Sequence, residues 1–392
     1  MSKLRELTTK GQSIWFDDLR RELLSSGELQ RLVAENSVTG VTTNPTILAR
    51  AISESSDYDE QLETLSRTGA TVEEVYAELV TTDIKAACEV LYPVWKYTNG
   101  DDGFVSVEVS PAVARDETAT VAEARHWVKR INRANLLVKV PATAAGAIAF
   151  EDLTAEGISI NVTLIFSLNR YRDIARRYIT GIERFMDSGG DPSGVHSVAS
   201  FFVSRVDTEV DKRLEKLDSV SSVRELRGKA GIANARVAYG IFEEIFSSDR
   251  WQRLARDGAT VQRPLWASTG VKDPAYPDTM YVDSLIAPHT VNTMPLETLR
   301  AVADHGHPDA GFSSEDITVA RSVLAELERA GIAYDDVTET IERQGLEKFS
   351  TSFEEMIKLL NGKLESNRGE RPDGSDIGQG QRSGNDPAAD VG

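Results

Sequence analysis

The chain has 392 residues, of which 40% are hydrophobic and 27% are charged, a composition typical of a globular protein. Its formal net charge of −18 argues against nucleic acids and membranes as partners, and no apolar run reaches the roughly 18 residues that span a bilayer. The single cysteine, Cys88, excludes an intramolecular disulfide framework, and residues 1–12 contain no apolar stretch of the signal-peptide kind, so a cytoplasmic protein is expected.

Short apolar or β-branched runs alternate along the chain with longer segments of helical spacing. The predicted strands, in chain order, are residues 13–16, 40–43, 104–107, 136–138, 158–160, 196–202, 264–268 and 281–286. Strands that alternate with helices pair in parallel, and eight of them predict an α/β fold, the closed (β/α)8 TIM barrel. The alternative is an open doubly wound sheet, which would carry a glycine-rich phosphate loop after its first strand; none is present.

The helical segments have apolar residues at three- and four-residue spacing, as in residues 72–80 and 120–131. Cys88 is expected at a buried helical position; the alternative, a nucleophilic thiol, lacks a neighbouring base that would activate it. Residues 1–362 are predicted to form a single barrel domain. Residues 363–392 are rich in Gly, Ser, Asp, Asn and Arg with few apolar residues, which predicts a disordered C-terminal tail.

Polar residues stand where the predicted strands end, and in a TIM barrel the active site is built at those ends. They are Asp17, Asn44, Glu108, Lys139, Asn161, Thr163, Ser200 and Ser268. Lys139 is the most informative, because it lies between apolar residues on both sides. Burial disfavours the charged form of a lysine and so lowers its pKa. An amine must be uncharged to attack a carbonyl. The alternative is a lysine that reaches water or pairs with Glu108 for structural reasons.

The other polar residues also have two interpretations. Asp17 and Glu108 are candidates for general acid and base next to a lysine, but Asp17 also precedes a helical segment that it could cap. Asn44 precedes Pro45, as in a helix start. Asn161 lies in an apolar strand and needs a buried partner, for which a substrate hydroxyl is one candidate.

Two cations are candidates for binding a phosphate group. Arg205 follows the predicted strand 196–202, and Lys272 lies in a glycine-containing loop after residues 264–268. A solvated charge or a structural ion pair is the alternative for each. The five histidines show no pairing with carboxylates at the spacing of metal ligands, so no metal site is expected.

Three motifs, in this order and spacing, resemble the signatures of the transaldolase family. They are GVTTNPT at 40–46, LVKVPAT at 137–143 and GISINVTLIFS at 157–167. The resemblance extends from about Ser13 to about Leu360 and is greatest to the long transaldolases of actinobacterial type. It implies a class I aldolase-like TIM barrel that uses no cofactor.

The resemblance also implies a reaction. Lys139 would form a Schiff base with the ketone of sedoheptulose 7-phosphate or fructose 6-phosphate, and a dihydroxyacetone unit would pass to glyceraldehyde 3-phosphate or erythrose 4-phosphate, a step of the pentose phosphate pathway. The resemblance implies that Asp17 is the base and that Glu108 and Thr163 position a water. It also implies that the dihydroxyacetone unit is bound by Asn44, Asn161 and Ser200, and that the phosphate is bound by Arg205.

Two positions bear on specificity. Phe202 matches the transaldolase pattern, whereas the related fructose 6-phosphate aldolases carry a tyrosine there. Many transaldolases have a second phosphate-binding arginine two residues after the serine that matches Ser268, but here that residue is Gly270, and we expect Lys272 to take its place. The competing functions are an aldolase that releases free dihydroxyacetone, a barrel that only binds sugar phosphates or a protein, and a metal-dependent isomerase or class II aldolase. Monomer and homodimer are both open.

Overall fold

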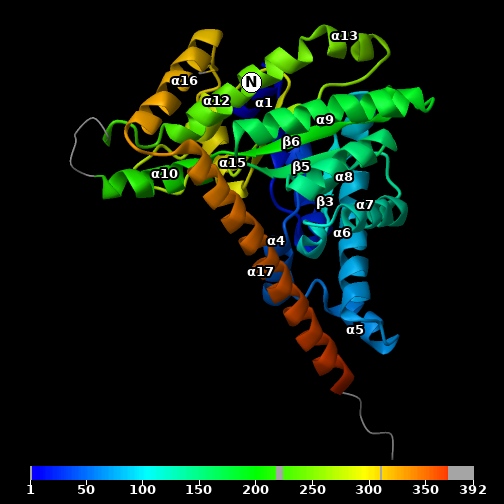
Figure 1. The fold of residues 1–392 in the computed structure, drawn as a ribbon. Coiled ribbons are helices and arrows are strands. Elements are labelled where there is room, and N and C mark those ends of the chain that lie inside the picture. The colour runs from blue at the N-terminus through cyan, green and yellow to red at the C-terminus, as the bar shows by residue number, and fades with distance from the viewer. Residues whose placement is uncertain (1, 218–223, 310, 370–392) are drawn as a thin grey trace, which may run out of the picture.

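The computed structural model describes residues 2–217, 224–309 and 311–369. Eight parallel strands close into a barrel in sequence order, from β1 next to β2 around to β8 next to β1 (Figure 1). The strands are β1 (Gln12–Phe16), β2 (Val38–Val41), β3 (Phe104–Glu108), β4 (Leu136–Pro141), β5 (Ile160–Ile165), β6 (Ser197–Phe202), β7 (Arg263–Ala267) and β8 (Thr290–Met294). The predicted (β/α)8 barrel is confirmed, and the doubly wound alternative is excluded.

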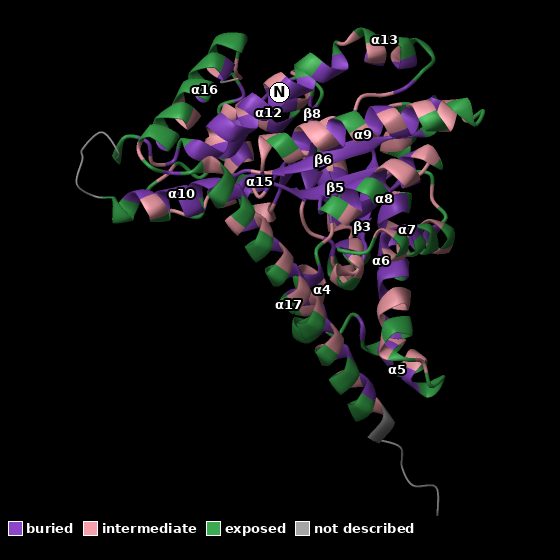
Figure 2. Ribbon diagram, in the orientation of Figure 1, coloured by how far each residue is buried: buried purple, intermediate pink, exposed green. Residues whose placement is uncertain are grey.

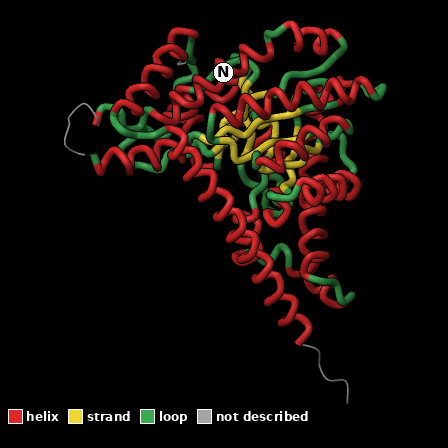
Figure 3. Tube along the Cα trace, viewed as in Figure 1, coloured by secondary structure: helices red, strands yellow, loops and turns green. Residues whose placement is uncertain are grey.

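Helices surround the barrel (Figure 3). Those before β6 are α1 (Lys3–Thr9), α2 (Arg21–Ser25), α3 (Glu28–Asn36), α4 (Pro45–Glu54), α5 (Asp59–Arg67), α6 (Val72–Tyr97), α7 (Glu117–Ile131), α8 (Ala144–Ala155) and α9 (Leu168–Asp187), with short 3-10 helices at Pro111–Val113 and Pro192–Gly194. Those after β6 are α10 (Ser204–Lys216), α12 (Ala230–Phe246), α13 (Asp249–Arg256), α14 (Met280–Ser284), α15 (Leu296–His305), α16 (Ser314–Arg329) and α17 (Tyr334–Gly369). None of the described helices is long and apolar enough to cross a membrane.

The main core lies between the strands and this ring of helices, and Figure 2 shows the strands as buried. Cys88 belongs to this core, on α6, so its predicted buried helical position is confirmed. A smaller apolar cluster fills the barrel interior and includes Trp15, Phe104 and Leu137. Gly40 of β2 makes room for the Trp15 indole, because a Cβ there would lie 2.5 Å from a ring atom. Apolar side chains therefore close the barrel below the mouth formed by the strand ends.

The eighth strand is not where the sequence predicts it. Residues 281–286 contain the short helix α14, and the strand is Thr290–Met294. A short apolar run fits a buried helical turn as well as a strand, and Tyr281, Val282 and Leu285 are all buried here. The sequence does not predict the true strand, because polar residues rarely indicate a buried strand. Its polar residues, Thr290, Asn292 and Thr293, are nevertheless buried in the barrel.

The long helix α17 changes the predicted domain boundary. It continues through residue 363 to Gly369, so the tail cannot begin at residue 363 as predicted. The physical reason is that Leu360 and Leu364 are buried against α5 and α6, and Lys363 Nζ lies 3.0 Å from Asp59 Oδ1. The remaining predicted tail, residues 370–392, lies outside the described residues. In Figure 1, α17 runs as one long rod from α10 past α4 towards α5.

Candidate active site

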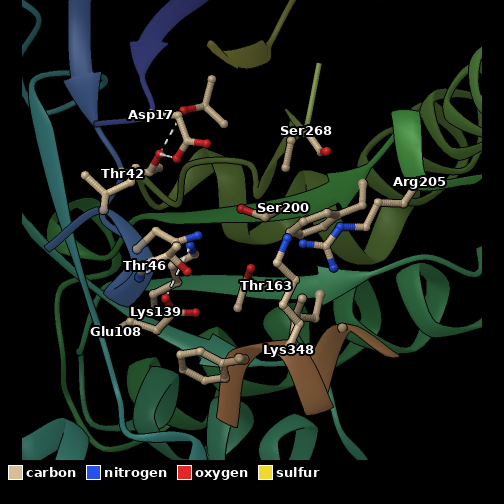
Figure 4. A pocket seen from close by; sticks show the side chains of 18 of the residues that line it. Asp17, Thr42, Thr46, Glu108, Lys139, Thr163, Ser200, Arg205, Ser268 and Lys348 are labelled. Carbon is tan, nitrogen blue, oxygen red and sulfur yellow. Dashed lines mark hydrogen bonds and ion pairs between the residues drawn. The ribbon is translucent and has the colours of Figure 1, made fainter. Parts of the chain in front are cut away.

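All the predicted site residues except Asn161 line one cavity of about 240 Å³ at the carboxyl ends of the strands (Figure 4). The strands supply Glu108, Lys139, Thr163, Ser200, Phe202 and Thr293, and the segments that follow the strands supply Asp17, Thr42, Asn44, Arg205, Ser268 and Lys272. Four further lining residues come from α17, namely Gly345, Lys348, Phe349 and Ser352. The cavity is therefore formed by the barrel mouth and one face of α17.

Lys139 lies at the centre of the site because the parallel register places it there. It is opposite Glu108 of β3 on one side and Asn161 of β5 on the other. Its Nζ donates to the carbonyl oxygen of Thr43 at 3.2 Å and lies 3.6 Å from Glu108 Oε2, an ion-pair distance too long for a hydrogen bond. The Lys139 side chain is only 11% exposed. The amine is thus held by few partners while it borders the cavity.

Glu108 is the buried carboxyl next to this amine. Burial raises the pKa of the Glu108 carboxyl, the positive charge of Lys139 opposes the rise, and the negative charge of Asp17 adds to it. A carboxyl with a raised pKa is protonated more easily than an ordinary glutamate, so it is suited to accept a proton and to return it. The arrangement of amine and carboxyl is suited to acid and base steps at a carbonyl carbon.

Thr163 has a hydroxyl without a partner among the described residues. Its Oγ1 is buried and makes no hydrogen bond, although the residue lines the cavity. The next residue, Leu164, has a φ of +59° and lies where the β5–β6 register shifts, and it also lines the cavity. Such an irregularity redirects side chains at the end of a strand. A buried hydroxyl left unpaired at a cavity wall is suited to hold a water or a substrate oxygen.

Asp17 is fixed by a chain of threonine hydroxyls. Thr42 Oγ1 donates to Asp17 Oδ1 at 2.6 Å, and Thr293 Oγ1 lies 2.8 Å from Thr42 Oγ1, placed to donate to it in turn. Asp17 does not cap a helix: α2 begins after Arg20, and its N-terminus has no side-chain cap. The capping interpretation is therefore wrong, and the Asp17 carboxylate is oriented towards the cavity.

Asn44 and Asn161 differ in their positions. Asn44 caps α4, because its side chain accepts from Thr46 N at 2.9 Å, and it also lines the cavity. Asn161 does not line it. Its amide donates to Ser106 Oγ at 3.1 Å and accepts from Ser200 Oγ at 2.7 Å, so protein groups satisfy it. Asn161 therefore lies beneath Ser200 and orients that hydroxyl.

The cations lie on the opposite side of the cavity. Arg205, in the first turn of α10, has its guanidinium carbon 5.0 Å from the centre of the Phe202 ring and forms no ion pair with any described residue. Burial lowers the pKa of Arg205 from its ordinary value. Ser268, with a φ of +57°, exchanges a hydrogen bond with Ser204 at 2.9 Å. Lys272 is exposed at the rim.

A family profile described as Transaldolase/Fructose-6-phosphate aldolase matches residues 14–360. The chain belongs to this transaldolase family. It is 49% identical over 93% of its length to a transaldolase of Arthrobacter sp. (strain FB24), which it covers to 98%. It is similarly 51% identical to a transaldolase of Thermobifida fusca, over 91% of this chain and 96% of that protein, and 48% identical to one of Mycobacterium bovis, over 93% and 97%.

The family profile matches almost the same range, about Ser13 to about Leu360, that the three motifs predict. The closed barrel is also the fold that the resemblance to transaldolases implies. No group of three or more histidine, cysteine, aspartate or glutamate side chains gathers as a metal site within the described part of the chain.

Some cavity residues of this transaldolase-family chain were not predicted. Thr42 lies inside the GVTTNPT motif, so it could have been found there. Thr293 lies in β8, which the sequence does not predict as a strand. Lys348, Phe349 and Ser352 come from α17, about 200 residues after Lys139 in the chain. No local pattern in the sequence indicates that this helix lies over the barrel mouth.

Proposed function

We propose that this enzyme transfers a dihydroxyacetone unit from sedoheptulose 7-phosphate or fructose 6-phosphate to glyceraldehyde 3-phosphate or erythrose 4-phosphate, through a Schiff base on Lys139. This is the transaldolase step of the pentose phosphate pathway. The observation that carries the proposal is the buried Lys139 amine, 3.6 Å from the Glu108 carboxylate, at the wall of a cavity that also holds Asp17. Binding a sugar phosphate without chemistry requires no buried amine beside a carboxylate.

The first half of the reaction forms the Schiff base. Lys139 attacks the ketone carbon, and loss of water requires a proton to reach the departing hydroxyl. Glu108 and the unpaired hydroxyl of Thr163 are assigned to hold the water that carries this proton. The iminium that results can accept, through the carbon next to it, the electron pair of the bond from that carbon to the following hydroxyl-bearing carbon.

The second half breaks that bond. Asp17 takes the proton from the hydroxyl beside the bond, and the aldose phosphate leaves while the enamine stays on Lys139. Thr42 holds the Asp17 carboxylate in place for this step. Asn44 and Ser200 are assigned to the hydroxyls of the dihydroxyacetone unit, and Asn161 contributes by orienting Ser200.

The phosphate group is assigned to the cationic side of the cavity. Arg205 has no carboxylate partner among the described residues, so its guanidinium is available for a bidentate contact. Ser268 lies beside it at the end of β7. Lys272 is assigned the role of the arginine that Gly270 lacks, and its Nζ lies 3.8 Å from where a Cβ would project from Gly270.

An aldolase that releases free dihydroxyacetone is the second candidate within the family. Phe202 disfavours it, because a phenylalanine cannot hydrogen-bond the water that would protonate and release the enamine product.

The experiment that tests the proposal is release of glyceraldehyde 3-phosphate from fructose 6-phosphate, with and without erythrose 4-phosphate. Release only with the acceptor present, together with borohydride trapping of the substrate on Lys139, is the expected result. Release without acceptor would identify an aldolase. No release in either condition would favour a binding-only barrel.

A further inference from the structure

Helix α17 places a lysine beside Arg205. The side chain of Lys348 borders the cavity, and in Figure 4 it extends from α17 towards the Arg205 guanidinium. Lys348 is exposed and forms no ion pair or hydrogen bond with any residue in the described ranges. A chain with a net charge of −18 offers many carboxylates, so two cations left unpaired side by side indicate a place for an anion.

The sequence of α17 keeps Lys348 free of helical ion pairs. The positions three and four residues away on either side are Gln344, Gly345, Thr351 and Ser352, none of which is acidic. Lys358 on the same helix has Glu354 and Glu355 at the corresponding preceding positions. The helix thus surrounds Lys348 with neutral neighbours at the sites where a carboxylate would neutralise it.

Gly345 allows α17 to approach this closely. A Cβ at position 345 would lie 3.2 Å from Arg205 Nη1 and 3.4 Å from Leu164 Cδ2, tighter than most such contacts. Because residues three apart share a helix face, Lys348 lies on the same side as Gly345. Thr46 Oγ1 donates to Ser352 Oγ at 2.8 Å one turn further on and fixes that side against α4.

We propose that Lys348 is a direct ligand of the substrate phosphate, beside Arg205, so that α17 completes the phosphate site. This rests on the proposed function for the identity of the substrate, but the predicted ligand chemistry, a phosphate group, can be tested without turnover. Lys348 supplies a point charge on a flexible stem, which complements the planar fork of Arg205.

The test is titration of the full chain with inorganic phosphate by calorimetry, repeated as competition against fructose 6-phosphate in the turnover assay. We expect Lys348→Ala to weaken phosphate binding and to raise the KM for fructose 6-phosphate by about tenfold or more, with little change in kcat. Lys348→Arg should stay within a few-fold of wild type. Lys358→Ala, an exposed lysine on the same helix that does not line the cavity, is the matched control and should change nothing.

The outcomes separate this inference from the proposed function. Unchanged phosphate affinity in Lys348→Ala, or no phosphate binding by the wild type, would overturn the assignment of Lys348 even if turnover is normal. A loss in Lys272→Ala with none in Lys348→Ala would overturn it too. If the wild type shows no turnover, the proposed function fails, and a Lys348-dependent affinity for phosphate would still support the anion site.

Discussion

Lys139 and Glu108 face each other across the β3–β4 register, with the amine 3.6 Å from the carboxylate and both side chains buried. The pairing places an amine and a proton donor or acceptor on the same wall of the cavity. Neither group forms a second ion pair with a described residue. Because the pair is fixed by strand register and not by a loop, its geometry is as rigid as the barrel.

The first prediction concerns the nucleophile. Lys139→Arg should fold and bind phosphosugars but lose turnover, because a guanidinium stays protonated at neutral pH and cannot form a Schiff base. The measurement is acceptor-dependent release of glyceraldehyde 3-phosphate, with thermal denaturation as the check on folding. Activity near that of the wild type in this variant would refute the Schiff-base mechanism.

The second prediction concerns Thr42, which donates to Asp17 at 2.6 Å. Thr42→Val keeps the shape of the side chain but removes the donor, so the Asp17 carboxylate loses its orientation. We expect kcat to fall by about tenfold or more, with little change in KM. Thr42→Ser keeps the hydroxyl and is the matched control. Equal rates in the two variants would show that the contact does not position Asp17.

The third prediction concerns pH and Asp207 on α10. Burial raises the pKa of Asp207 to about 6; hydrogen bonds from Gly231 N and the Tyr281 hydroxyl oppose the rise, and the charge of Asp211 adds to it. The native state therefore binds this proton more tightly than the unfolded state. Protonated Asp207 therefore stabilises the native state fully below about pH 4, and this stabilisation is lost as the pH rises through about 6.

Asp207→Asn removes this titration. The difference in unfolding free energy, wild type minus variant, should fall by up to about 3 kcal/mol between about pH 4 and about pH 7. Urea denaturation of both proteins across this range measures it. A difference that stays constant with pH would mean that the carboxyl keeps its ordinary pKa in the native state.

The fourth prediction concerns the end of α17. A chain of residues 1–359 lacks Leu360 and Leu364, which are buried against α5 and α6, and lacks the Lys363 contact with Asp59. Its unfolding free energy should fall by about 4 kcal/mol or more. A chain of residues 1–369 keeps these contacts and is the comparison. Equal stability of the two chains would show that this end of α17 does not hold the helix in place.

Seven of the eight strands, and the presence of polar residues at the cavity where those strands end, could be predicted from the sequence, for a physical reason. Strands such as Leu136–Pro141 are apolar runs that end in a polar residue, and parallel strands bring those ends together. Strand β8 could not be predicted, because Asn292 and Thr293 are polar although buried. Asn292 Oδ1 accepts a hydrogen bond from Thr269 Oγ1 inside the barrel, and no local pattern in the sequence indicates such a contact.

The parts of the site that depend on distant packing were also beyond the sequence. Asn161 was expected to contact substrate, but Ser106 and Ser200 from neighbouring strands satisfy its amide. In the sequence, the neighbours of Lys348 are those of an ordinary surface lysine. Its place at the cavity depends on how α17 crosses the mouth. That path depends on the close approach of Gly345 to Arg205 and on the hydrogen bond between Ser352 and Thr46.

The position of α17 in the chain has a consequence during translation. All eight strands and Lys139 leave the ribosome before α17 does, because every strand precedes α17 in the chain. A nascent barrel therefore has its amine before it has Lys348 and Phe349 at the mouth. On the proposed assignment, such a chain holds phosphosugars weakly until α17 has been synthesised and has packed over the mouth, which delays reaction at the amine until then.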